Sequence, residues 1–308
     1  MLYKTKWRGW LTVLAIVLFF SCSRSNPEVQ RPSFKQVEGI NFIEVRREFE
    51  NGLSFNEYGF QLIPEWDLHF LPGDSVKIYS PFEKRYIYYP IYFDHGQVIN
   101  FAREWLRLKH VSKDSLVLQL LRVREKVIDK KRSNVYMRFY SAEYIKNTLR
   151  SNAESLRKPN IRDTLFIKKL VARAKANPTN SDSLFTARTP VALKSTIPEI
   201  TVSIQKPSKE DVDYKASDEY MGVEYHVEIK RAYKDFYNSF TAFVDDKGKV
   251  TVGKFAVIEP DFEAPQRRVL QGVVDVYIQH FLEVTPGKTL GMPHPTEIML
   301  HVRGRKAK

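Results

Sequence analysis

Residues 239–258 read SFTAFVDDKGKVTVGKFAVI and carry the clearest hairpin signal of the chain. Phe240, Ala242 and Val244 alternate with other residues, as in a strand with one buried face. The turn is expected at residues 246–249, DKGK, because Gly248 can adopt the positive φ that a tight turn needs. Residues 250–258 then form the return strand, so this stretch predicts a β-hairpin.

An amphipathic helix follows the hairpin and starts near Pro265, a residue that a first helical turn tolerates. Its apolar residues recur on one helix face: Val269, Leu270, Val273, Val274, Tyr277, Ile278 and Phe281. Residues 223–229 before the hairpin and residues 297–303 after the helix both alternate with period two. Residues 217–308 are therefore predicted to form a β-β-β-α-β domain, with the helix covering one face of the sheet.

This segment resembles the C-terminal domain of the TonB energy-transducer family. The matching residues are Phe243-Val-Asp-Asp-Lys-Gly248-Lys-Val250, Arg268-Val269, Phe281, Pro286-Gly287-Lys288, Gly291 and Pro293. The resemblance implies the family's fold and a partner peptide that pairs with a sheet edge. The family's transducers keep an uncleaved membrane helix, so the resemblance is carried over to the fold and not to energy transduction.

The last strand, residues 297–303, is predicted to be that peptide-binding edge. Its inward residues are Ile298, Leu300 and Val302. Its outward residues form the candidate protein-binding site: Glu297, Met299, His301 and Arg303. Polar and charged residues on an edge strand discourage indiscriminate pairing.

Residues 41–145 are predicted to form an antiparallel β domain. Short alternating segments, among them residues 75–80, 86–93 and 105–109, are separated by turn residues. Trp105 and the hairpin that follows it resemble the lipocalin-like domains of bacterial lipoproteins, which implies a small barrel that can carry a hydrophobic ligand. The overall fold class is thus α+β, with this all-β domain followed by the TonB-like domain.

Residues 146–216 are predicted to be a helical and Pro-containing linker. Residues 164–176 have an amphipathic pattern and predict a helix. Pro178, Pro190, Pro198 and Pro207 follow among polar residues, which predicts mostly extended or irregular chain.

Residues 1–21 have the features of a signal peptide, with Lys4, Lys6 and Arg8 before an apolar run of about eleven residues. The run is shorter than the ~20 residues of a spanning helix. Ser21-Cys22 at its end resembles a bacterial lipobox, which implies cleavage and lipidation at Cys22, the single cysteine of the chain. The alternative is an ordinary signal peptide that contains a cysteine. Residues 22–40 are predicted to be a tether.

No catalytic constellation is found in the sequence. One cysteine allows neither an intrachain disulfide nor a cysteine zinc cluster. The seven histidines are scattered without ligand spacing, so no metal and no cofactor are predicted. Gly287-Lys288-Thr289 lacks the earlier glycine of a phosphate-binding loop and is interpreted as a turn.

The net charge of +13 has three interpretations: a nucleic-acid surface, attraction to anionic headgroups or glycans, and a solvated surface with a basic bias. A secreted lipoprotein has little access to nucleic acid, so no nucleic-acid partner is predicted. The chain is interpreted as a non-enzymatic binding or adaptor lipoprotein of the cell envelope, anchored in the outer membrane and facing the periplasm. Its partners would be the membrane and an envelope protein or peptide. The alternative function is carriage of a small hydrophobic ligand in the N-terminal domain.

Overall fold

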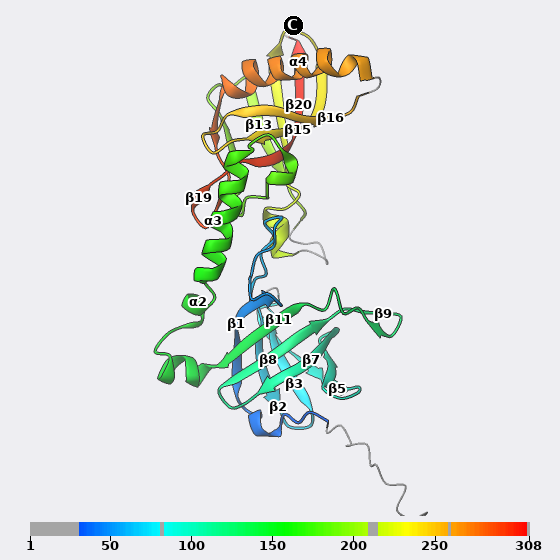
Figure 1. The fold of residues 1–308 in the computed structure, drawn as a ribbon, viewed down its shortest axis with the longest axis vertical. Coiled ribbons are helices and arrows are strands. Elements are labelled where there is room, and N and C mark those ends of the chain that lie inside the picture. The colour runs from blue at the N-terminus through cyan, green and yellow to red at the C-terminus, as the bar shows by residue number, and fades with distance from the viewer. Residues whose placement is uncertain (1–30, 81–82, 209–214, 258–259, 307–308) are drawn as a thin grey trace, which may run out of the picture.

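The computed structural model describes residues 31–80, 83–208, 215–257 and 260–306. Its shape is elongated, with one β-sheet at each end and helix α3 (Ile161–Ala176) running between them (Figure 1). The predicted α+β class is confirmed, and strands outweigh helices.

The N-terminal sheet is a nearly closed antiparallel barrel. Its strands are β1 (Asn41–Phe49), β2 (Asp67–Leu71), β3 (Ser75–Ser80), β4 (Arg85–Pro90), β5 (Tyr92–Phe93), β6 (Val98–Phe101), β7 (Glu104–Val111), β8 (Ser115–Leu121) and β11 (Val135–Ser141). They pair in the order β4-β3-β2-β1-β11-β8-β7-β6-β5. Only Ile91 separates β4 from β5, so the two edges of the sheet are consecutive parts of one bent strand. Within the described residues, the chain therefore forms an eight-stranded meander, which agrees with the antiparallel β domain predicted for residues 41–145.

The barrel interior is occupied by its own side chains. Among the described residues, sixteen buried hydrophobic side chains form one core cluster there, including Phe42, Phe70, Phe101 and Phe139. A barrel of eight strands has an interior just wide enough for such side chains to fill. A small hairpin, β9 (Val123–Arg124) and β10 (Val127–Ile128), extends from the barrel between β8 and β11.

Part of the predicted tether belongs to this core. Phe34 and Val37 are buried in the barrel cluster, and the ring of Phe34 stacks on Phe70 with 4.4 Å between centroids. Between them the chain forms a 3₁₀ turn, Lys35–Val37. The prediction of a tether over residues 22–40 is therefore wrong for residues 34–40, because two apolar side chains that lacked periodicity in the sequence close the end of the barrel.

The C-terminal sheet has five strands in the described part of the chain. They are β13 (Ile200–Gln205), β14 (Glu224–Ala232), β15 (Phe236–Val244), β16 (Val250–Phe255) and β20 (Thr296–Lys306). Their order is β13-β14-β20-β15-β16, and β14 runs parallel to β20. Helix α4 (Glu263–Val273), extended by the wider π-helical turns of η6 (Val274–Gln279), covers one face (Figure 1).

The predicted hairpin is formed by β15 and β16. Val244 pairs with Val250, and Asp245 Oδ1 accepts hydrogen bonds from the backbone of Lys247 and Lys249, each 2.8 Å long. Gly248 has a φ of 86°. A Cβ there would lie 2.4 Å from the carbonyl oxygen of Val284, so both the turn and the packing require glycine.

The helix stripe is present with one exception. Leu270, Val273, Val274 and Ile278 are buried against the sheet. Val269, predicted to share that face, is 55% exposed. The predicted apolar face of the helix therefore included one residue, Val269, that does not face the sheet.

The described part of the segment predicted to be a linker contains two α-helices and two strands. The described elements there are η2 (Tyr144–Thr148), α2 (Ala153–Leu156), α3, η3 (Ser181–Ser183), β12 (Ala192–Ser195), β13 and the start of η4 (Ala216–Glu219). The predicted helix is confirmed. The chain after Pro178 was expected to be extended or irregular, and its extended parts are paired strands: β12 pairs with β17 (Leu282–Thr285), and β13 joins the C-terminal sheet. The interpretation of this stretch as a linker is therefore wrong. The remaining short elements are η5 (Pro260–Phe262), β18 (Lys288–Thr289) and β19 (Met292–Pro293).

A third hydrophobic core joins the two ends of the molecule. Phe55, in the loop after β1, packs with α3 and with Phe243 of β15. Gly59 lies so close to Thr186 that a Cβ would approach its carbonyl oxygen to 2.2 Å. The hydroxyl of Tyr220 accepts a hydrogen bond from the backbone of Gln61 at 2.9 Å. The segment that was predicted to be a linker is therefore packed structure in contact with both sheets.

Candidate functional site

The strand that carries the predicted binding residues lies in the centre of its sheet. β20 pairs with β14 on one side and with β15 on the other. The prediction that Glu297, Met299, His301 and Arg303 lie on a free edge is therefore wrong. The chain leaves α4 and inserts its last strand between β14 and β15, which are neighbours in sequence but not in the sheet. Backbone pairing with a partner at β20 is blocked on both sides.

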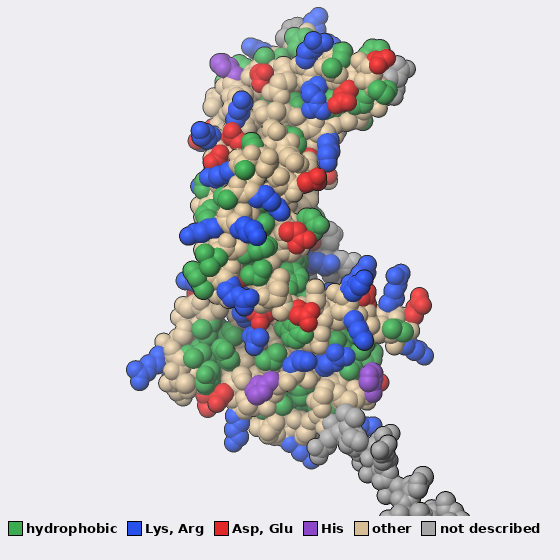
Figure 2. All heavy atoms as spheres, in the orientation of Figure 1, with side chains coloured by type: hydrophobic (Ala, Val, Ile, Leu, Met, Phe, Trp, Pro, Cys, Tyr) green, Lys and Arg blue, Asp and Glu red, His purple; other side chains and the backbone are tan. Residues whose placement is uncertain are grey.

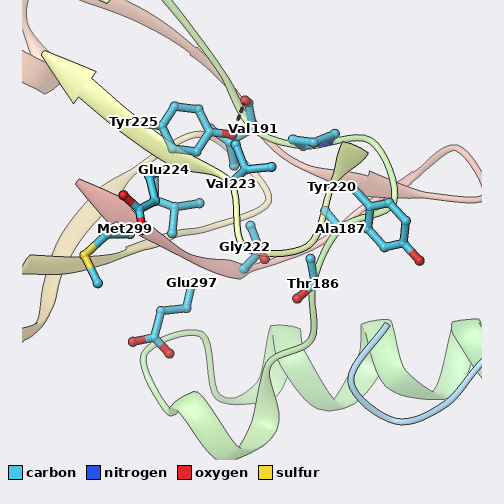
Figure 3. A pocket seen from close by; sticks show the side chains of 13 residues that line it. Thr186, Ala187, Val191, Tyr220, Gly222, Val223, Glu224, Tyr225, Glu297 and Met299 are labelled. Carbon is cyan, nitrogen blue, oxygen red and sulfur yellow. Dashed lines mark hydrogen bonds between the residues drawn. The ribbon is translucent and has the colours of Figure 1, made fainter. Parts of the chain in front are cut away.

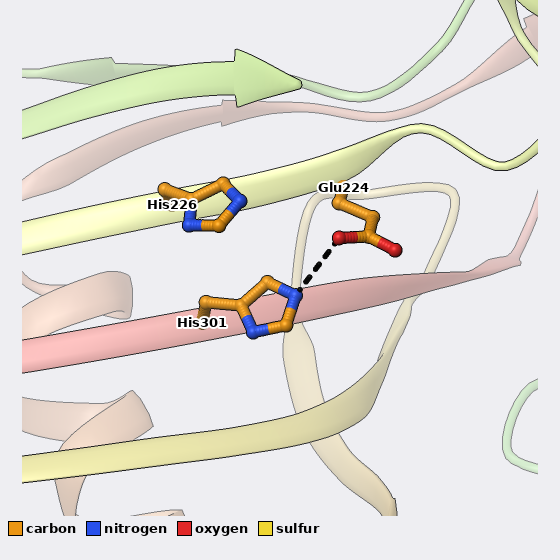
Figure 4. Close-up of side chains that lie close together, drawn as sticks. All are labelled: Glu224, His226 and His301. Carbon is orange, nitrogen blue, oxygen red and sulfur yellow. Dashed lines mark hydrogen bonds and ion pairs between the residues drawn. The ribbon is translucent and has the colours of Figure 1, made fainter. Parts of the chain in front are cut away.

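The four side chains nevertheless share the sheet face opposite α4. Because residues of a strand alternate between faces, Ile298, Leu300 and Val302 point into the core while the four point away from it. On β14, Glu224 lies in register with Met299, and His226 lies in register with His301. Parallel pairing thus gathers one acid and two imidazoles on this face (Figure 4).

His301 is held by neighbours from two strands. Its Nε2 lies 3.2 Å from Glu224 Oε2, and its Nδ1 lies 3.0 Å from the hydroxyl of Ser239 and 3.2 Å from that of Tyr237. The ring of His226 stacks on that of His301, with 4.5 Å between centroids. Among the described residues, the buried Nε2 of His226 has no hydrogen-bond partner.

A cavity adjoins this face where β14 and β20 begin. It has a volume of about 280 Å³ and is lined by residues from the stretches 186–191, 220–225 and 296–299 (Figure 3). Glu224 and Met299 belong to both the cavity and the histidine face. The hydroxyl of Tyr225 donates to the carbonyl of Val191 at 2.6 Å, and burial raises the pKa of this tyrosine. One side of the cavity is therefore held by the hydrogen bond between Tyr225 and Val191, and the acidic side chain of Glu224 also lines the cavity.

The two true edges of the sheet differ. The edge at β16 is capped by side chains of α4 and η6: Gln271 accepts from the backbone of Val252 at 3.0 Å, and Gln279 accepts from that of Val250 at 2.9 Å. The edge at β13 has exposed residues over most of its length. Hence β13, and not β20, is the edge that a partner strand can reach.

Basic side chains do not gather into one patch on the face drawn in Figure 2. Lys and Arg are spread along the whole length of the molecule, with Asp and Glu between them. On this face the distribution agrees with a solvated surface of basic bias more than with a track for an extended polyanion.

Comparisons with protein-family models and with curated proteins find no match to this chain. No helix in the described part of the chain is long and apolar enough to span a membrane. Cys22 and the predicted signal peptide lie outside the described residues.

Sequence reasoning missed Glu224 and His226 as partners of His301. Both occupy outward positions of an alternating strand, and His301 does so in another. The sequence signal available was that all three residues occupy outward positions in alternating strands. Such a position indicates only which face of the sheet a residue occupies. Which strands are neighbours on that face is a property of the sheet order.

Proposed function

We propose that this protein is a lipid-anchored, non-enzymatic binding or adaptor protein of the cell envelope, and that it binds an extended peptide at the edge of β13. The observation that supports this most is the open edge at β13, in a sheet whose other edge is capped by α4 and η6. An open edge offers a row of main-chain donors and acceptors to an added strand.

The register identifies the groups that point outward. Lys230 donates its backbone N–H to the carbonyl of Glu199, which makes 199 and 230 a hydrogen-bonded pair of the antiparallel ladder. Such pairs alternate with pairs whose N–H and C=O groups point away from each other. Ile200, Val202 and Ile204 occupy those alternate positions. Their backbone groups therefore face the open side, where a partner strand would pair.

The side chains of β13 fit selective rather than indiscriminate pairing. Thr201, Ser203 and Gln205 are exposed polar residues on one face, and Ile204 is a 47% exposed apolar residue on the other. Lys206 follows, 3.3 Å from Glu219. A short edge strand followed by a charged residue, here Lys206, resists aggregation. The exposed side chain of Ile204 offers an apolar contact to a side chain of the partner.

The structure gives no observation that favours the alternative, ligand carriage in the barrel. Its interior holds packed aromatic and aliphatic residues. The barrel is better suited to hold the C-terminal sheet at a defined position, through the core that α3 shares with Phe55 and Phe243.

Ile204→Pro is expected to lower the recovery of a bound partner by up to about tenfold while the protein remains folded. The proline removes an outward N–H, and the lost hydrogen bond is worth about 1.4 kcal/mol, which is tenfold in affinity. An edge strand tolerates proline at such a position. The measurement is photo-crosslinking from position 201 in intact envelopes, alongside a thermal melt of each variant.

Ile204→Ala is the matched control, because it keeps the N–H and removes only the side chain. Its partner recovery should stay well above that of the proline variant. Unchanged recovery with Ile204→Pro, in a protein that melts like the parent, would rule out strand addition at β13.

Cys22→Ser is expected to release the mature protein from the membrane fraction. A diacylglyceryl group contributes about 0.8 kcal/mol of membrane affinity for each buried CH₂, and serine cannot form the thioether. Fractionation of envelopes and mass spectrometry of the mature chain measure this, with Ser23→Ala as the control beside the cysteine. An unmodified Cys22 in the mature protein would contradict the lipid anchor.

A further inference from the structure

Glu224, His226 and His301 present three metal-binding groups to one point on the C-terminal sheet. One ligand atom from each residue can be chosen so that all three lie within 4.8 Å of one another. They come from two adjacent parallel strands, β14 and β20, whose register fixes their spacing. A sheet backbone held by pairing on both sides is a rigid base for such a set. Figure 4 shows the two rings side by side with the carboxylate at their end.

We infer that these three residues bind a divalent transition-metal ion of the Zn²⁺ type. Two imidazoles and one carboxylate are a common ligand set for zinc, with bonds of about 2.0–2.2 Å. In a tetrahedral site such bonds put neighbouring ligand atoms about 3.3 Å apart. His301 Nε2 and Glu224 Oε2 already lie 3.2 Å apart. The rings of His226 and His301 are stacked, so His226 has to turn out of this stack to direct its nitrogen at the same ion.

The unpartnered nitrogen of His226 is an independent sign of a missing ligand. Its Nε2 is buried, and no described residue makes a hydrogen bond to it. A buried polar atom without a partner costs about 1–3 kcal/mol. A metal ion at this position would satisfy that nitrogen together with the carboxylate of Glu224.

The surroundings also orient the second histidine as a ligand. With a metal ion on Nε2, Nδ1 of His301 would carry the proton and donate it to the hydroxyl of Ser239 at 3.0 Å or of Tyr237 at 3.2 Å, which fixes the ring as a ligand. When Nε2 carries a proton toward Glu224, metal binding displaces it. The side chain of Glu224 is 45% exposed, so the fourth coordination position opens to solvent beside the cavity.

The metal site does not depend on the proposed function. β13 pairs with β14, so that Ser203 lies opposite His226 and Gln205 opposite Glu224. Strand addition uses the outward backbone groups of β13, however, and needs no metal. A protein that binds no zinc would leave the peptide-binding proposal intact. A protein that binds no peptide at β13 would likewise leave the metal site intact.

The test is a titration of the full mature lipoprotein in detergent with Zn²⁺ alone, read by competition with a chelating dye. One zinc ion per chain is expected. His226→Ala and His301→Ala should each weaken binding by more than about 100-fold, and Ser239→Ala, which removes only an orienting group, by about 10-fold. Substituted Co²⁺ should show the visible absorption of a tetrahedral site.

His110→Ala is the matched control, because His110 is exposed on the barrel, and its affinity should equal that of the parent. All four histidine and serine variants should melt like the parent, since none of these side chains lies in a hydrophobic core. The inference is overturned if the parent binds no stoichiometric zinc, or if His226→Ala binds it as tightly as His110→Ala does.

Discussion

Asp163→Ala is expected to lower the free energy of unfolding by about 3–5 kcal/mol, because it removes one partner of a buried ion pair. Asp163 lies in the first turn of α3 and is 0% exposed. Its carboxylate is 3.0 Å from the guanidinium of Arg46 on β1. It also accepts hydrogen bonds from the backbone of Ser54 at 2.8 Å and of Asn160 at 3.0 Å.

This carboxylate connects the start of α3 to Arg46 and Ser54, which lie more than 100 residues earlier in the sequence. Arg46 belongs to the barrel, Ser54 precedes the junction residue Phe55, and Asn160 caps the helix with a reciprocal capping box. Alanine would leave a partly buried guanidinium and two backbone N–H groups without this acceptor. The barrel and the junction should therefore weaken together.

Denaturant unfolding followed by tryptophan fluorescence measures the effect on the barrel, since Trp66 and Trp105 both belong to it. Far-ultraviolet circular dichroism reports on the whole chain. Asp182→Ala, at an exposed position of η3, is the control and should change the unfolding free energy by less than about 0.5 kcal/mol. Equal stability of the two variants would show that Asp163 does not hold the junction.

The second large effect is expected from pH and concerns His294. This side chain is 0% exposed and stacks on Phe185 with 3.8 Å between centroids. Its Nε2 lies 3.0 Å from the hydroxyl of Thr289, and its Nδ1 lies 3.0 Å from the carbonyl of Pro295. The carbonyl can only accept, so Nδ1 carries the proton and Nε2 accepts from Thr289.

Burial lowers the pKa of His294 to about 4, because the imidazolium would be desolvated. In the unfolded chain the pKa is about 6.5. Above pH 6.5 the histidine is neutral in both states and does not oppose folding. As the pH falls from about 6.5 to about 4, the unfolded state binds a proton that the folded state does not. Over that window the protein should lose on the order of 3 kcal/mol through this residue, and nothing further below it.

His294→Gln removes this titration, so its unfolding free energy should fall less steeply than that of the parent between pH 6.5 and 4. The comparison of slopes matters, since carboxylates of both proteins titrate at the lower end of the window. Parallel curves for the parent and His294→Gln would mean that burial does not lower the pKa of His294 in the folded protein.

Local patterns predicted much of the secondary structure, because their causes are local. Residues 75–80 alternate and form β3 with the same bounds, and residues 105–109 lie within β7. The turn at Gly248 follows from the single residue that accepts its backbone angle. Helix α3 was predicted from its apolar spacing. The buried Phe34 and the strands β12 and β13 were not, since short apolar segments between prolines carry no period that distinguishes them from loop.

The sequence by itself determined which residues face a core and which face away, through the alternation along β14 and β20 and the stripe along α4. The tertiary structure alone decided which strands are neighbours. An outward position looks the same in an edge strand and in a central strand when one face of the sheet is polar, so the pattern of residues 297–303 could not distinguish the two. Insertion of β20 between β14 and β15 removed the predicted edge, left β13 as the open one, and brought His301 beside His226 and Glu224.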